Sequence, residues 1–126
     1  MLTVKSDLVK TRIPRLPFTE IAGAILGSSY ELSVVFVGDT RSAKLNNTYR
    51  GKNKPTNILS FPYDETSGEI VIDISLVARE ASTLKRSLPS YLGYIFIHGC
   101  LHLAGLDHGH IMEDKETHYL HRFDLL

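Results

Sequence analysis

The sequence predicts an α+β fold in which a single mixed sheet of four strands packs against several helices. The chain has 126 residues, 43% of them hydrophobic, which suits one compact core. Strand and helix patterns mix along the whole chain, without repeats, linkers or low-complexity stretches. One strand is apolar on both faces, as expected for the centre of a covered sheet. We therefore expect residues 1–126 to form one domain.

The first expected elements are a short helix and the central strand. Thr19 is the predicted N-cap of the helix, which follows a proline-rich lead-in, and Gly27 closes it. Residues 31–39, ELSVVFVGD, are predicted to form the strand that is apolar on both faces.

A second helix and two more strands are expected in the middle of the chain. Asp39 or Thr40 is the predicted cap of a helix over residues 40–51, which ends in a glycine. Residues 57–65, NILSFPYDE, contain the next predicted strand, which ends at their proline. The proline places this strand near an edge of the sheet. Residues 68–75, GEIVIDIS, form the other strand.

Three helices are expected after the last strand. The first covers residues 76–86. The second begins near Pro89, which a first helical turn tolerates, and stops at Gly105. Its apolar residues surround the axis, so this helix is expected to be buried on most sides. Residues 112–122 are predicted to form the last helix.

The composition of the chain suits a cytoplasmic protein. Cys100 is the only cysteine, so no intramolecular disulfide can form, as is usual in a reducing cytosol. The residues near the N-terminus lack the long apolar run that would predict a secretory signal. Residues 87–106 contain no Asp, Glu, Lys or Arg, but they include a proline and two histidines. We therefore expect a buried helix there and no membrane partner.

Charge is distributed unevenly, although the formal net charge is zero. Residues 1–54 hold nine Lys/Arg and four Asp/Glu, a net +5, and residues 55–126 hold five and ten, a net −5. Five basic residues follow one another without an intervening acid: Arg41, Lys44, Arg50, Lys52 and Lys54. Such a basic cluster is able to attract phosphate, although a solvated helix and loop would have the same charges.

Four of the six histidines fall within HGCLHLAGLDHGH, residues 98–110. His98 and His102 are four apart, so a helix places both imidazoles on one face. Gly105 lets the chain leave the helix, so that His108 is able to return as a third ligand. Three histidines around zinc leave a fourth position for water, the arrangement of a catalytic site. Separate buried imidazoles would each need another partner.

Other residues near this run are open to two interpretations. Asp107 either orients an imidazole by contacting the side of the ring that faces away from the metal, or it caps a turn. His110 is either a spare ligand or a loop residue. His118 and His121 fit a partly exposed face of the last helix. Cys100 points away from the histidines around the helix, so it is a poor ligand.

The histidine spacing also matches H-x-x-x-H-x-x-G-x-x-H, the pattern of metzincin zinc proteases. Those enzymes carry a glutamate directly after the first histidine, where it acts as general base. This chain has Gly99 at that position. Glycine neither takes a proton nor orients water, so the peptidase interpretation is disfavoured.

HGCLHLAGLDH resembles the H-G-x-L-H-L-x-G-[YF]-D-H signature of the YbeY family of bacterial rRNA maturation factors. LNNTYRGKNKPTNILSFP, residues 45–62, and GEIVIDISLVAREA, residues 68–81, resemble further segments of that family in order and spacing. The match covers roughly residues 31–110. Leu106 stands where an aromatic residue is usual.

The resemblance implies a zincin-like α+β fold and a zinc-dependent endoribonuclease specific for single-stranded RNA. It implies a role in ribosome quality control and in maturation of the small-subunit rRNA 3′ end. His98, His102 and His108 would be the ligands of one Zn²⁺ ion. Arg50 matches the functionally important arginine of the family. Expected partners are ribosomal RNA precursors and the ribosome or its associated proteins.

The chemistry of these residues is compatible with phosphodiester cleavage. Zinc lowers the pKa of bound water to about 7 and polarises a phosphoryl oxygen. Arg50 is able to hold the same phosphate through two hydrogen bonds, with Lys52 and Lys54 as peripheral phosphate contacts. The nucleophile is either water at the zinc or the 2′-OH of the RNA.

Two other interpretations stay open. The first is a non-catalytic ribosome-assembly factor in which zinc braces the fold and the basic cluster binds RNA. The second is a metallopeptidase, which Gly99 disfavours. Arg50 considered alone is also an ordinary cation at a helix C-terminus, where the helix dipole favours it.

Overall fold

The structure is a computed structural model that describes residues 2–6 and 9–126. Its helices and strands follow one another as β1 (Leu2–Ser6), α1 (Phe18–Leu26), β2 (Glu31–Val37), α2 (Asp39–Arg50), β3 (Ile58–Asp64), β4 (Ser67–Asp73), α3 (Ile74–Thr83), α4 (Leu88–Leu103) and α5 (His110–Arg122).

The strands of the described residues form one mixed sheet in the order β1-β2-β4-β3. β2 pairs in parallel with β1 on one side and with β4 on the other, while β3 pairs antiparallel with β4. The predicted α+β fold with a four-stranded mixed sheet is confirmed, and β2 is central, as its two apolar faces indicated. The sequence pattern did not identify β1, which is short and only half apolar.

β3 lies at the edge of the sheet, as predicted, but it does not end at Pro62. The strand continues to Asp64, and its pairing with β4 shifts register between these two residues. Proline has no N–H to donate, and an edge strand with an irregular register tolerates this loss. One side of β3 therefore stays free of strand partners among the described residues.

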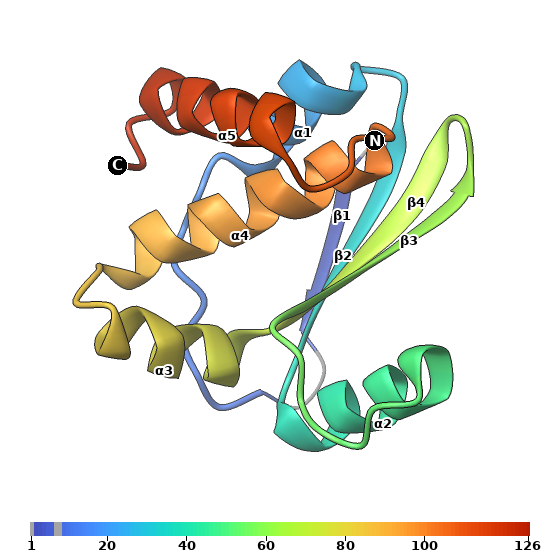
Figure 1. Ribbon diagram of the computed structural model, residues 1–126, viewed down its shortest axis with the longest axis vertical. Helices are drawn as coiled ribbons and strands as arrows, with labels where there is room; N and C mark the ends of the chain where they lie inside the picture. The colour runs from blue at the N-terminus through green and yellow to red at the C-terminus, as the bar shows by residue number, and fades with distance from the viewer. Residues whose placement is uncertain (1, 7–8) are drawn as a thin grey trace.

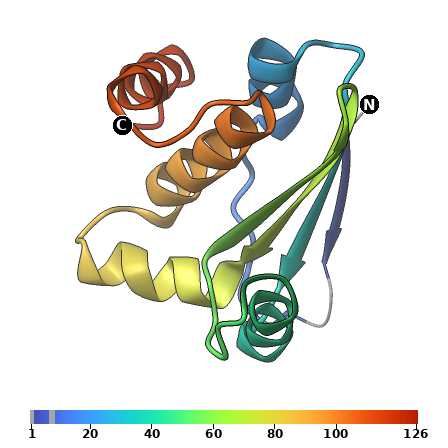
Figure 2. The same cartoon turned by 45° about the vertical axis from the view of Figure 1, so that its right-hand side comes forward.

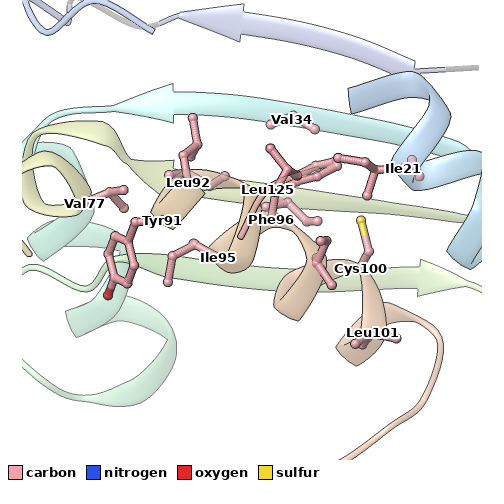
Figure 3. Close-up of a cluster of buried hydrophobic side chains, with 14 of the residues drawn as sticks. Ile21, Val34, Val77, Tyr91, Leu92, Ile95, Phe96, Cys100, Leu101 and Leu125 are labelled. Carbon is pink, nitrogen blue, oxygen red and sulfur yellow. The ribbon is translucent and has the colours of Figure 1, made fainter. Parts of the chain in front are cut away.

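The helices cover the two faces of the sheet unequally (Figures 1 and 2). α1, α3, α4 and α5 contribute to the large core on one face, some of which Figure 3 shows. Among the described residues, α2 is the one helix that packs on the other face, where Leu45 contacts a small cluster of Val37, Leu59 and Val71. Part of that second face is therefore left uncovered by helices.

α4 runs through the middle of the large core. The bounds of this helix match the prediction. The Ser87 side chain caps its first turn, and Gly105 follows its end. Cys100 is fully buried in the core, which raises the pKa of its thiol (Figure 3). The cysteine therefore points away from the histidines, as expected. Within the part of the chain that the structure describes, none of the helices combines the length and apolar character of a membrane span.

The predicted start of α1 is wrong. Thr19 lies inside the helix, which begins at Phe18 after Pro17, and no side chain caps it. The Phe18 ring packs against Phe36 and Phe96, with centroids 5.9 and 5.0 Å away. The first residue of this helix is therefore anchored by aromatic packing on the core and not by a local side-chain cap.

The predicted cap of α2 is also wrong. Asp39 and Thr40 lie within the helix, and Gly38 occupies the N-cap position without a side-chain hydrogen bond. The Asp39 carboxylate instead pairs with Arg79 of α3, whose Nη2 donates to Oδ1 at 3.0 Å and whose Nη1 lies 3.0 Å from Oδ2. An ion pair between helices has replaced the local cap.

Candidate metal centre and its cleft

Three histidines converge where α4 ends. His98 and His102 lie in the last turns of α4, and His108 lies in the loop before α5. One ring nitrogen from each lies within 4.8 Å of the other two. Gly105 has a φ of +93°, which only glycine adopts easily, and it turns the chain back after the helix. The convergence predicted from their spacing is therefore present.

The outer nitrogens of two rings have fixed partners. Nδ1 of His98 lies 3.1 Å from Oε2 of Glu116, and Nδ1 of His102 lies 3.0 Å from the carbonyl oxygen of Leu106. A carbonyl and an ionised carboxylate only accept, so both rings donate from Nδ1. Each Nε2 is then left with its lone pair available for a metal ion.

The inner nitrogens of the same two rings face each other. Nε2 of His98 lies 3.1 Å from Nε2 of His102, and two lone pairs at this separation repel each other. Burial lowers the pKa of His102, and the neighbouring histidines lower it further, which favours the neutral form of this ring that binds metals. A divalent ion held by neutral imidazoles fits this donor set, and zinc, copper, iron and nickel all accept imidazole.

Glu116 is a site residue that the sequence analysis missed. It lies on α5 with only 6% of its surface exposed, and Met112 and Leu120, four residues before and after it, are also buried. Burial raises the pKa of the neighbouring Tyr94, and the Glu116 carboxylate raises it further. A glutamate within the buried stripe of a helix was the available signal, because a buried charge needs a partner.

We expect Glu116→Ala to weaken metal binding about 10- to 100-fold, as removal of an outer partner of a histidine ligand does. Glu116→Gln should lose less, because its amide oxygen still accepts from Nδ1 of His98. Competition titration with a coloured chelator measures the affinity. Glu113→Ala is the matched control, since Glu113 is exposed on the same helix. Equal affinity in wild type and Glu116→Ala would contradict the role of Glu116.

The histidines open into a cleft of about 420 Å³. Its other lining residues come from the end of α2, from β3 and from the loop between them: Arg50, Thr56, Asn57, Ile58 and Ser60. Asn57 donates to Oε1 of Glu80 at 3.1 Å, and Ser60 donates to the carbonyl oxygen of Gly99 at 3.4 Å. The structure thus brings Arg50 and the three histidines to one cleft, whereas the role of Arg50 stays a prediction.

Other predicted residues lie outside the lining of this cleft. Lys52 and Lys54 are exposed in the loop after α2, and their phosphate contacts stay a prediction. Asp107 is exposed and acts on His102 only through its charge, which raises the pKa of that ring slightly against the larger lowering causes. His110 is exposed beside Asp114 at 3.8 Å and is not in the histidine group.

Gly99 lies where α4 approaches the sheet most closely. A Cβ atom on this residue would lie 2.6 Å from Cδ1 of Ile58, 3.2 Å from Cδ1 of Ile70 and 3.3 Å from Oγ of Ser60. These contacts come from two strands, so the neighbours must move to admit even a methyl group. The glycine therefore provides room for helix–sheet packing beside the histidines.

We expect Gly99→Ala to lower the free energy of unfolding by about 1–3 kcal/mol through overpacking. Gly23→Ala is the matched control, because Gly23 is also helical and nothing lies within 4 Å of an added Cβ there. The control should be neutral or stabilising, since alanine is the better helix former. Denaturant unfolding measures both. A Gly99→Ala variant as stable as wild type would contradict the packing argument.

The chain is similar to known proteins in sequence and in fold. A protein-family model described as "Endoribonuclease YbeY" matches residues 14–124 of the chain. The solution structure of TM1509 from Thermotoga maritima is similar in fold, with a TM-score of 0.67 and 24% sequence identity. That similarity covers 95% of this chain and 87% of TM1509.

Proposed function

The chain belongs to the YbeY family of endoribonucleases, and on this premise we propose that it is a zinc-dependent enzyme that cleaves single-stranded RNA. Its substrate would be ribosomal RNA precursor, with the small-subunit 3′ end as the site of maturation. A role in ribosome quality control and association with the ribosome are part of the same proposal. So is a cytoplasmic location, which the single cysteine suits.

The observation that carries the proposal is the shared cleft of Arg50 and the three histidines. A metal ion bound by the histidines and the guanidinium of Arg50 would be two positive centres in one cleft, which suits the negative charge of a phosphodiester. A bound divalent ion would supply a Lewis acid for the phosphoryl oxygen and lower the pKa of a water molecule. The imidazoles of His98, His102 and His108 would hold this ion, with the first two kept in place by Glu116 and Leu106.

The other residues of the cleft would position the RNA. Arg50 offers two parallel N–H donors to a phosphate, which a lysine does not. Thr56, Asn57 and Ser60 offer hydroxyl and amide groups suited to sugar and phosphate oxygens. The 2′-OH that distinguishes RNA from DNA is a natural partner for such groups.

The proposed mechanism has no carboxylate base in the lining of this cleft. None of the described lining residues is Asp or Glu. The attacking group would therefore be a water activated at the ion or the 2′-OH of the RNA. A zinc peptidase differs in this respect, because it uses a glutamate base beside its first histidine. Here that position is Gly99, which the sheet contacts closely.

The direct test is metal analysis of protein purified without added metal, followed by assays with and without a chelator. Substrates are a single-stranded RNA, the same RNA in a duplex and a peptide library. We expect one zinc per chain and chelator-sensitive cleavage of the single-stranded RNA alone. RNA binding without cleavage would favour an assembly factor, and peptide hydrolysis would favour a peptidase. Either result would overturn the proposal.

A further inference from the structure

A second hollow, of about 360 Å³, lies on the face of the sheet opposite α4. Its floor consists of Val35, Val37 and Val71, and Leu45 of α2 borders it. In Figures 1 and 2, α2 is the one helix of the described chain on this side of the sheet. We call this hollow the sheet groove.

Exposed aromatic rings border the sheet groove. Tyr49 is 63% exposed and Tyr63 is 64% exposed, although tyrosines usually bury more of their rings. The Tyr49 ring contacts the edge of Phe61 with centroids 4.9 Å apart, and the Tyr63 hydroxyl donates to Glu69 at 3.1 Å. These contacts hold both rings while leaving much of their surface exposed. A contiguous apolar surface with polar edges marks a binding site.

The sheet groove and the histidine cleft are neighbours across one strand. Successive side chains of β3 point to opposite faces, so Ile58 and Ser60 line the cleft while Phe61 and Tyr63 line the groove. The last turn of α2 divides in the same way. Tyr49 lines the groove and Arg50, the next residue, lines the cleft. A polymer that leaves the cleft past Arg50 would therefore meet the tyrosines next.

The charge around the groove suits a polyanion. Arg41 lines it, and Lys44 is exposed on the same helix. The basic cluster continues through Arg50 into the loop, with no acid between residues 41 and 54. Glu69 is an acid of the lining, and its carboxylate is engaged by Tyr63 and by Ser33. Cations beside stacking rings are the usual combination in single-strand binding grooves.

We infer that the sheet groove is a base-stacking subsite for single-stranded RNA. A nucleotide that flanks the cleaved bond would cross β3 and place its base against Tyr49 or Tyr63, with its phosphate near Arg41. The inference rests on the proposed function, because it takes the cleaved phosphate to lie in the histidine cleft. It also gives a physical reason for single-strand preference, since paired bases cannot be splayed onto aromatic rings.

The test is binding of zinc-loaded protein to cleavage-resistant RNA made of 2′-O-methyl phosphorothioate nucleotides. One probe is an oligonucleotide long enough to cross β3, and the other is a dinucleotide that reaches only the cleft. We expect Tyr49→Leu, Tyr63→Leu or both to weaken binding of the long probe about fivefold or more, the effect of losing one stacked base. The dinucleotide should bind all proteins equally.

Matched variants separate stacking from simple apolar contact. Tyr49→Phe and Tyr63→Phe keep the rings and should bind the long probe nearly as wild type does. Both tyrosines are largely exposed, so these changes should leave the fold intact, which circular dichroism checks. Wild-type affinity of both leucine variants for the long probe would overturn the inference and leave the groove for a protein partner.

The assay also separates this inference from the proposed function. Binding does not depend on cleavage, so loss of long-probe affinity in the leucine variants supports the subsite even if wild type cleaves no RNA. Cleavage by wild type together with unchanged binding in both leucine variants overturns the subsite alone.

Discussion

His98→Ala and His102→Ala are expected to bind no zinc at micromolar concentrations and to lose RNA cleavage by a factor on the order of a hundred or more. The Nε2 atoms of the two rings lie 3.1 Å apart, so each ring is half of the closest donor pair in the site. Two remaining imidazoles rarely hold zinc tightly. Lewis-acid stabilisation of a transition state is worth several kcal/mol, and about 1.4 kcal/mol changes the rate tenfold.

The same variants should also respond differently to added zinc when they unfold. An ion that binds only the native state stabilises it by mass action, so zinc should raise the unfolding midpoint of wild type. It should raise the midpoint of neither alanine variant. Metal content by mass spectrometry and thermal unfolding with and without zinc measure the two effects.

Exposed histidines of the last helix provide the matched controls. His110→Ala and His118→Ala remove an imidazole from α5 without touching the histidine group. Both should keep full zinc content and full cleavage. Full zinc occupancy in His98→Ala and His102→Ala would show that the assigned ligands are wrong.

The histidine group was predictable because its members are close in the chain. A helix places residues four apart on one face, and one glycine is enough to return His108 to that face. Glu116 was not predictable in the same way, because its contact with His98 exists only once α5 packs on α4. The sequence shows that Glu116 falls in the apolar stripe of its helix, but tertiary packing alone determines its partner.

The fold shows the same division between local and non-local information. α4 has local start and stop signals, and its predicted bounds agree with the structure. α1 begins with a ring packed on the core, and Asp39 at the start of α2 pairs with Arg79 of α3, contacts that no local pattern contains. β1 is short and becomes a strand through parallel pairing with β2, some thirty residues later in the chain.

The open second face of the sheet was likewise beyond the sequence pattern. Val35 and Val37 are apolar, so the pattern predicted that both faces of β2 were covered. In the structure, α2 covers one part of this face and the groove with its exposed tyrosines occupies another. An apolar position in a strand predicts that its side chain avoids water, but not whether a helix of the same chain or a ligand provides the cover.

Arg50→Ala is expected to keep its fold and its zinc and to lose at least about tenfold in cleavage, or about 1.4 kcal/mol of barrier. Arg50 is exposed at the end of α2, so little packing is lost, and it lines the same cleft as the three histidines. If the guanidinium holds the phosphate as charge develops on it, the loss should appear in turnover rather than in binding alone. Arg50→Lys should recover only part of the rate, because lysine keeps the charge but lacks the two-donor fork.

The neighbouring lysines provide the matched comparison for Arg50. Lys52→Ala and Lys54→Ala should mainly raise KM and alter the salt dependence, as peripheral phosphate contacts do, because neither residue lines the cleft. The decisive measurement is single-turnover cleavage of single-stranded RNA by zinc-loaded Arg50→Ala at saturating protein. Under that condition weaker binding no longer limits the rate, so a slower reaction reports the transition state. A rate equal to wild type would make Arg50 an ordinary cation at a helix C-terminus, and phosphate stabilisation would have to come from the metal ion and from Thr56, Asn57 and Ser60 of the cleft.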